Sequence, residues 1–369
     1  MLDIRELLKM AIEKKASDLH LTENSAPILR IDGRLTFIDQ PPLKKDELKK
    51  SIYGLLSDLQ KEKFERDKEL DFSLQLEGLE RFRTNIHIQR GCVEGAFRRI
   101  STYIPAMGEL GLPPAITQFA RKQNGLVLIT GPTGSGKTTT LASMINLINV
   151  ERACMITMIE DPIEYVHVNK KSVIKQREVY SDTHSFAEAL KRCLRQDPDI
   201  IVVGEMRDLE TISTALTAAE TGHLVLATLH TPDAAQTIER IIDVFPPHQQ
   251  QQVRLQLSAS LEGVVSQKLL ARAEGKGRAL VSEVLTATPA VRNLIREQAI
   301  EQIPTAIQTG SQFGMHTMDS SLKTLYEQGV ITYEEAHVHV KNIEEFKRLL
   351  DHSQTAKSGH AVKSRKGAF

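Results

Sequence analysis

Gly131-Pro132-Thr133-Gly134-Ser135-Gly136-Lys137-Thr138 is the stretch that decides the fold. It matches the pattern GxxxxGK followed by Ser or Thr, and it lies between the apolar run Leu126–Thr130 and a helical pattern over Thr138–Ile148. A strand before the motif and a helix after it form the setting that the motif requires. Its glycines let consecutive backbone N–H groups point at one place, and the start of the helix adds partial positive charge. The stretch therefore predicts a loop that binds phosphate.

The loop residues are expected to bind ATP or ADP together with Mg²⁺. Lys137 is placed to reach the β- and γ-phosphates, and the hydroxyl of Thr138 is placed to ligate the metal ion. The alternative is a chance match in a glycine-rich turn, which the flanking strand and helix disfavour. The expected nucleotide-binding residues are Gly131, Pro132, Thr133, Gly134, Ser135, Gly136, Lys137, Thr138 and Thr139.

Acidic residues follow two further apolar runs of the same region. Glu205 comes just after Ile200–Val203, where an acid can support Mg²⁺ directly or through water, and Glu160, Asp161 and Glu164 follow Cys154–Ile159. Their simpler interpretation is a solvated acidic turn. Ligands of open α/β sheets collect at the carboxyl ends of the strands, so we favour a role at the phosphate site.

Two histidines, His223 and His230, bracket the apolar run Leu224–Leu229. A histidine at a strand end is commonly a hydrogen-bonded surface residue, while a pair at the ends of one core strand can sense the γ-phosphate. Both interpretations stay open on the residues alone. After His230, the chain is expected to start a helix with Thr231 as N-cap and Pro232 at its first position.

Composition and pattern limit the class of protein and its location. The 369 residues carry 47 basic and 47 acidic side chains, no Trp and 5% aromatic residues, which disfavours a surface that stacks single-stranded nucleic acid. The three cysteines contain no CxxC pair for zinc, and neither a signal segment nor a membrane span is evident. The expected location is the cytoplasm.

The pattern of apolar and polar residues divides the chain into an α+β domain over residues 1–104, a linker over 105–118 and an α/β domain over 119–352. In the second domain, continuous apolar runs alternate with helical patterns, as in a parallel sheet buried on both faces. The portion from about residue 246 is expected to be helical. Residues 353–369 are expected to form a basic disordered tail.

Seven ordered motifs resemble those of known proteins. Four are similar to the Walker A, Asp box, Walker B and His box of the type II/IV secretion ATPase superfamily, and three resemble its type IV pilus retraction ATPases. The first four are Gly131–Thr138, Ile156–Glu164, Gln196–Asp208 and Ala219–Thr231; the others are Ser17–Leu21, Leu194–Asp199 and Ala290–Glu297. The last departs from the family pattern by Val291 in place of Ile, and the zinc-binding cysteines of extension ATPases are missing.

The resemblance implies a PAS-like N-terminal domain, a RecA-like ATPase domain and assembly into a homo-hexamer. It implies that Glu164 is the general base, that Glu205 supports Mg²⁺, and that His223 and His230 couple nucleotide state to ring conformation. It also implies that Arg83 and Arg98 bring positive charge from the N-terminal domain to the phosphates; otherwise both would simply keep a strand soluble.

The implied function is a motor that uses ATP hydrolysis to retract type IV pili and so drives twitching motility. It would work at the inner face of the cell membrane on a platform protein, with other pilus ATPases as possible partners and no nucleic acid. The arginines of the Ala290–Glu297 helix, Arg292 and Arg296, are expected to remain free for motor function. The alternatives are a RecA-like DNA translocase or helicase, and an accessory pilus or secretion ATPase.

Overall fold

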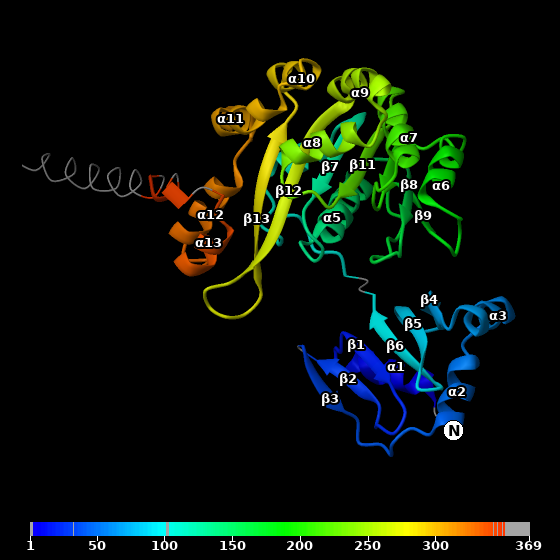
Figure 1. Ribbon diagram of the computed structural model, residues 1–369. Helices are drawn as coiled ribbons and strands as arrows, with labels where there is room; N and C mark the ends of the chain where they lie inside the picture. Colours follow the sequence, from blue (N-terminus) through cyan, green and yellow to red (C-terminus); the bar gives the residue numbers. More distant parts are fainter. Residues whose placement is uncertain are drawn as a thin grey trace, which may run out of the picture. The chain divides into compact units, whose positions relative to one another are not determined.

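The computed structural model describes residues 3–31, 33–100, 103–341, 343–344, 346–348 and 350 (Figure 1). The chain forms two compact units. One extends to Tyr103 and includes the short segment Pro162–His167, and the other contains Ile104–Asp161 and the chain from Val168 onward. The residues expected to form a basic tail, 353–369, lie outside the described residues.

The first unit is built on an antiparallel sheet of six strands in the order β3-β2-β1-β6-β5-β4. Apolar residues alternate along the strands, as β4 shows, so one face of the sheet is buried and the other carries polar residues. Three helices complete the unit, and buried aromatic residues such as Phe64, Phe82 and Phe97 fill its core. The elements are α1 (Ile4–Glu13), β1 (Asp18–Leu21), β2 (Ile28–Ile31), β3 (Arg34–Phe37), α2 (Lys45–Tyr53), α3 (Asp58–Asp67), β4 (Glu69–Gln75), β5 (Arg81–Gln89) and β6 (Cys92–Arg99).

The second unit is built on a sheet of seven strands in the order β13-β12-β7-β11-β10-β8-β9. Every pair from β12 to β9 in that order is parallel, and β13 is added antiparallel at one edge. The strands that the sequence predicted from continuous apolar runs are all present. They are β7 (Gly125–Thr130), β8 (Met155–Glu160), β10 (Ile200–Val203) and β11 (Leu224–Leu229), while the edge strand β9 (Val173–Glu178) was not predicted.

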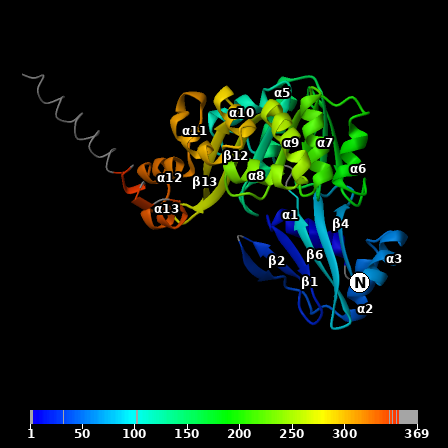
Figure 2. The ribbon, with the colours of Figure 1, turned by 45° about the horizontal axis from the view of Figure 1, so that its top comes forward.

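Helices cover both faces of this sheet, which explains why its central strands are apolar throughout. Leu126 and Leu128 of β7 pack into a core with residues of the helices from α6 to α11, whereas Val127 and Ile129 pack into a second core with α4 and α5. Figure 2 shows α6, α7, α8 and α9 together on one side. The structure confirms the α/β class with two sheets. The helices are α4 (Pro114–Ala120), α5 (Lys137–Glu151), α6 (Phe186–Cys193), α7 (Leu209–Glu220), α8 (Ala234–Asp243), α9 (Pro247–Ser260), α10 (Pro289–Arg296) and α11 (Ile303–Thr309).

The expectation of a helical portion from about residue 246 is wrong in one important respect. Two long strands, β12 (Leu261–Ala271) and β13 (Arg278–Thr286), follow α9 and form a hairpin that extends the sheet beside the phosphate-loop strand (Figure 1). Charged and polar residues interrupt both runs, which hides their period. Their pairing with β7 decides the conformation, because β propensity depends strongly on such context.

Two small helices near the end of the described residues pack against the far end of this hairpin. Leu270, Ala279 and Val281 of the strands form a buried cluster with Met318, Leu322 and Ala336 of the helices. These helices are α12 (Met318–Glu327) and α13 (Tyr333–His339), and two short 3₁₀ turns, η1 (Ile300–Gln302) and η2 (Ser311–Phe313), precede them in the chain. Across the described ranges of the chain, helices long and apolar enough to cross a membrane are absent.

Candidate functional site

The phosphate loop has the backbone that its glycines predict. Gly131 has φ +137° and Gly136 has φ +88°, both in the region that side-chain-bearing residues avoid. A Cβ at Gly131 would lie 2.2 Å from the carbonyl oxygen of Gln267 and 2.8 Å from the hydroxyl of Ser135. Gly136 is the N-cap of α5 and supplies no side chain to its free N–H groups. The loop therefore forms a cradle that leads into the N-terminus of α5, where backbone N–H groups are free to donate to a ligand.

Two polar side chains of the loop point to an anionic ligand. Lys137 is only 9% exposed, and its Nζ donates to the carbonyl oxygens of Gly131 at 2.8 Å and Pro132 at 3.0 Å. The hydroxyl of Ser135 is buried and has no hydrogen-bond partner within the described chain. A buried ammonium held against the carbonyl groups of the loop and the unsatisfied hydroxyl of Ser135 both favour binding of phosphate oxygens.

Gln267 of β12 is a site residue that the sequence did not reveal. It is 1% exposed; its Nε2 donates to the carbonyl oxygen of Ser135 at 2.9 Å, and its Oε1 accepts from the Thr140 hydroxyl at 3.1 Å. Both ends of one amide thus hold the loop and the first turn of α5 together. The signal was absent because β12 lies in the region expected to be helical.

The acid after β10, Glu205, lies at the same edge of the sheet as the loop. Its Oε1 lies 2.6 Å from Nε of Arg207, and its Oε2 accepts from Nη2 of Arg207 at 2.6 Å. Burial raises the pKa of Glu205, but the hydrogen bond from Arg207 and the nearby charges of His230 and Arg207 outweigh it, so the pKa lies below its ordinary value. Glu205 is therefore an ionised carboxylate with a guanidinium already bound to it.

His230 lies between the phosphate loop and this acid. Strand β11 runs between β7 and β10, so the residue after β11 falls between the ends of its neighbours. The His230 ring approaches the Thr133 hydroxyl with Nδ1 at 3.5 Å and Oε1 of Glu205 with Nε2 at 3.3 Å. One imidazole ring therefore lies against both the phosphate loop and the acid after β10.

His223 lies elsewhere. It precedes β11, its carbonyl accepts from the N–H of Gly125 at 3.0 Å, and its Nδ1 lies 3.0 Å from the carbonyl oxygen of Ala218. Since β11 has 6 residues, the two histidines are about 20 Å apart along the strand. Within one chain they do not form a single site, because a parallel strand carries its two ends to opposite edges of the sheet.

The acids after β8 separate into two groups. Glu160 is 6% exposed and accepts from Nε2 of Gln176 at 2.9 Å, so it is a buried structural acid. Asp161 is the last residue of the first segment of the second unit. Glu164 is exposed and lies in Pro162–His167, a segment that belongs to the first unit. The role of Glu164 as general base therefore stays a prediction.

Arg83 and Arg98 face each other on neighbouring strands of the first unit. They are directly paired in the register of β5 and β6, and Arg98 is in turn paired with Asp18 of β1. Nε of Arg98 donates to Oδ1 of Asp18 at 2.9 Å. Burial raises the pKa of Asp18. The hydrogen bonds from Ser17 and Arg98 and the charge of Arg98 lower it by more, so the pKa lies below its ordinary value. Asp18 is thus ion-paired with Arg98, and Nε of Arg30 lies 3.8 Å from its Oδ2.

The residues at the loop fit a magnesium ion with few protein ligands. Thr138 begins α5 beside Lys137, and Glu205 is ionised at the same sheet edge. Over the described part of the chain, no group of three or more His, Cys, Asp or Glu side chains is arranged so that it could hold a metal ion. Mg²⁺ bound with phosphates keeps several waters and takes one or two protein ligands, so such a cluster is not needed. Because Arg207 occupies both oxygens of Glu205, a contact through water suits the geometry.

Arg292 is not free, contrary to the expectation. Its Nη1 donates to the carbonyl oxygens of Ser258 and Ala259 at 2.7 Å each, and its Nε donates to that of Ala287 at 3.0 Å. Its Nη2 also lies 2.8 Å from Oε1 of Glu262. Arg292 therefore ties α10 to the end of α9, where unpaired carbonyl groups attract cations. Arg296 makes one exposed bond, to Asn293 at 3.2 Å.

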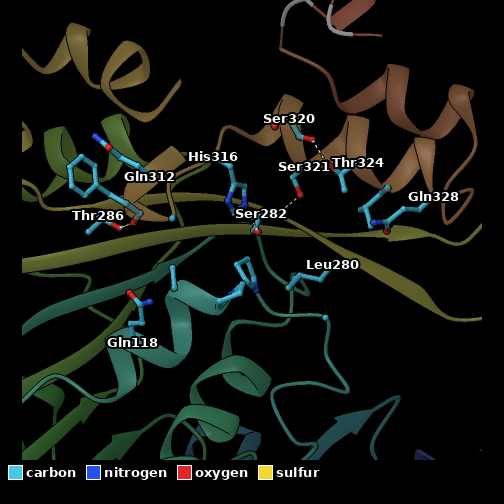
Figure 3. Close-up of a pocket in the computed structure, with 17 residues that line it drawn as sticks. Gln118, Leu280, Ser282, Thr286, Gln312, His316, Ser320, Ser321, Thr324 and Gln328 are labelled. Carbon is cyan, nitrogen blue, oxygen red and sulfur yellow. Dashed lines mark hydrogen bonds between the residues drawn. The ribbon is translucent and has the colours of Figure 1, made fainter. Parts of the chain in front are cut away.

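A cavity of about 700 Å³ lies away from the phosphate loop, between α4, β13 and α12 (Figure 3). Its lining side chains are uncharged, with hydroxyl and amide groups from residues such as Ser282, Ser321 and Gln118. His316 contributes its Nε2, which lies 3.1 Å from the Ser282 hydroxyl. Burial lowers the pKa of His316, which favours a neutral imidazole. These residues lack the positive charge that favours phosphate binding.

Comparison with known proteins places these features in a family. Residues 2–338 match the model of the type II/IV secretion system protein family. The chain is 48% identical to the type IV pilus retraction ATPase PilT of Pseudomonas aeruginosa over 94% of the chain and 100% of the relative. It is 38% identical to the type IV pilus ATPase PilU of the same organism, over 97% and 94%.

A solved structure is similar over nearly the whole chain. The crystal structure of the pilus retraction motor PilT with bound ADP superposes with a TM-score of 0.89 at 48% identity, and the match covers 94% of this chain and 100% of the other. The family match over residues 2–338 includes the phosphate loop, Glu205 and His230.

Proposed function

Because this chain belongs to the type II/IV secretion system protein family and is an ATPase, we propose that it powers the retraction of type IV pili. The observation that carries the proposal is its 48% identity to a pilus retraction ATPase over that relative's full length. The lower identity of 38% to the pilus ATPase PilU favours the retraction motor over the accessory ATPase. The buried lysine and the glycine cradle of the loop supply the nucleotide site that such a motor needs.

In this proposal, the loop binds the phosphates of ATP before any chemistry occurs. The backbone N–H groups at the start of α5 and the Ser135 hydroxyl donate hydrogen bonds to phosphate oxygens. Lys137 exchanges its contacts with carbonyl oxygens for contacts with phosphate oxygens. Thr138 and Glu205 would hold Mg²⁺, which supplies positive charge to offset that of the phosphates. Gln267 keeps the loop closed on α5 while its contacts change.

Hydrolysis needs a base for the attacking water and positive charge for the departing phosphate. We assign the base to Glu164, as the family resemblance implies, because its exposed carboxylate can accept the proton of water. Arg83 and Arg98 supply the charge from the first unit. His230 responds when the γ-phosphate leaves, because its ring contacts both Thr133 and Glu205.

Retraction requires the chain to work as an assembly. We propose a homo-hexamer at the inner face of the cell membrane, in which closure of each subunit on ATP moves its neighbours and turns a platform protein in the membrane. Pilin subunits would then leave the base of the fibre. His223, about 20 Å along β11 from His230, is available in this scheme to respond at the opposite edge of the sheet.

Two measurements distinguish a pilus motor from a DNA motor: the effect of single-stranded DNA on ATP turnover, and the phenotype of a strain that lacks the chain. ATP turnover by the purified chain should be unchanged by single-stranded DNA, since the chain has net charge +0 and no Trp. A strain that lacks the chain should be covered in pili and unable to twitch. Strong stimulation by DNA would favour a translocase, and bald cells would favour an extension ATPase.

A further inference from the structure

Three buried acids meet one lysine at the start of α8, three residues after His230. Nζ of Lys341 lies 2.9 Å from Oδ2 of Asp233 and 3.8 Å from Oε2 of Glu283, and the backbone N–H of Lys341 donates to Oδ1 of Asp319 at 3.0 Å. Asp233, Glu283 and Asp319 are 7%, 5% and 8% exposed. Lys341 follows α13, so a cation from the C-terminal helices balances acids at the nucleotide edge.

Two of these acids fix the first turn of α8. Oδ1 of Asp233 accepts from the N–H of Gln236 at 2.9 Å, and Oε1 of Glu283 accepts from the N–H of Ala234 at 2.9 Å. Asp233 is the N-cap with extended backbone, whereas the Thr231 expected there bonds the Thr237 hydroxyl at 2.7 Å instead. Both carboxylates thus accept from free N–H groups at a helix N-terminus, where negative charge is also favourable.

The same residues lie at the level of the phosphate loop. Glu283 of β13 is paired in register with Ser266 of β12, which is paired with Thr130 of β7, the residue before Gly131. The hydroxyls of Ser266 and Thr130 are 2.7 Å apart. The loop from His230 to Asp233 is thus fixed at one end by Glu205 and Thr133, and at the other by the acids that Lys341 balances.

From this arrangement we propose that Lys341 is a positioning residue for ATP hydrolysis, which holds the start of α8, and through it His230, in the geometry that the active site requires. The proposal rests on the ATPase activity of the proposed function. A half-exposed ion pair by itself contributes little. The effect here comes from the acids, because loss of Lys341 leaves two buried carboxylates near each other without a cation, and burial already raises the pKa of Glu283.

The test uses the full-length chain and substitutions at Lys341 and at Glu283, the two partners of one ion pair. Lys341→Met should lower kcat for ATP hydrolysis by about three- to tenfold and leave KM within about twofold, because His230 moves while the phosphate loop is intact. Lys341→Arg should restore most of kcat. The double variant Lys341→Met with Glu283→Gln should also recover, since glutamine removes the excess charge and its Oε1 can still accept from Ala234.

The pH dependence separates this role from a merely structural one. The charged groups around Glu283 are Asp233 before α8, Lys341 after α13 and Asp319 of α12. When folding raises the pKa of an acid, the folded protein loses stability as the pH rises toward that raised pKa. In Lys341→Met the kcat deficit should therefore become smaller as the pH is lowered, because protonation of Glu283 removes the excess negative charge.

A matched control is Lys323→Met on α12, which removes a pair of 4.0 Å with Glu327 in the same group of C-terminal helices. It should leave kcat unchanged. Hydrogen exchange of the Ala234 and Gln236 amides should become faster in Lys341→Met and not in Lys323→Met, which gives a readout independent of turnover. Unchanged exchange and kcat in a folded Lys341→Met, or no recovery in the double variant, would overturn the proposal. A wild-type chain without ATP turnover would instead refute the proposed function.

Discussion

Arg292 allows a quantitative test of how α10 is held. Replacing it by Ala removes the donors to the carbonyl oxygens of Ser258, Ala259 and Ala287, and the ion pair with Glu262. The side chains of Arg292 and Glu262 are 22% and 16% exposed, so water replaces the lost partners only in part. We therefore expect a substantial loss of stability with the phosphate loop left intact.

The magnitude follows from the contacts. Hydrogen bonds to a charged group contribute about 1.5–3 kcal/mol each, and breaking a buried pair by removing one partner costs about 3–5 kcal/mol. Glu262 keeps Lys122 at 2.6 Å, and the carbonyl oxygens at the end of α9 can take up water, so the estimate falls to about 3 kcal/mol. In a unit of this size, that corresponds to a fall in Tm of about 6–12 °C.

Thermal unfolding of Arg292→Ala beside Arg296→Ala measures this directly. Arg296 lies one turn further along α10 and makes only an exposed bond to Asn293, so its removal should shift Tm by less than about 2 °C. Below the transition, ATP turnover of Arg292→Ala should remain near that of the wild type. A Tm for Arg292→Ala within about 2 °C of the wild type would refute the view that this arginine is a structural tie.

Three further predictions concern the nucleotide site and the first unit. Glu164→Gln should bind ATP with unchanged affinity and lose nearly all hydrolysis, because an amide can hold water but cannot take its proton; loss of binding in a filter assay would instead make Glu164 structural. Gln267→Leu should raise KM for ATP by about tenfold, since it removes the two bonds that join Ser135 to Thr140, and an unchanged KM would show that the loop is held without them. Asp18→Asn should destabilise the first unit by about 1–2 kcal/mol in urea at neutral pH. Because the pKa of Asp18 is lowered, its contribution is present above the ordinary pKa of Asp and disappears as pH falls through the folded value, so the variant and the wild type should converge in acid.

The phosphate loop and its strands could be predicted because their signal is local. GxxxxGK followed by Thr specifies a backbone that few other residues adopt, and the continuous apolar runs of β7, β10 and β11 report burial on both faces. Glu205 and His230 could be singled out for the same reason, since His230 directly follows such a run and Glu205 follows one after Gly204.

The remaining site depends on contacts between distant residues, which a single sequence does not show. Gln267 lies on a strand whose polar residues hide its period, and its role comes from Ser135, 132 residues away. Arg292 looked free because its partners are backbone carbonyl groups and an acid on β12. His223 and His230 seemed equivalent in the sequence, and only the direction of β11 separates them.

ATP hydrolysis at the phosphate loop is the step that we propose drives retraction. The direct test replaces the chromosomal copy by Lys137→Ala and measures pilus number and twitching in the same cells. Lys137 is the buried cation of the loop, so the variant should assemble pili that accumulate on cells unable to twitch. Normal twitching with normal pilus number would contradict the claim, and so would cells that lose their pili.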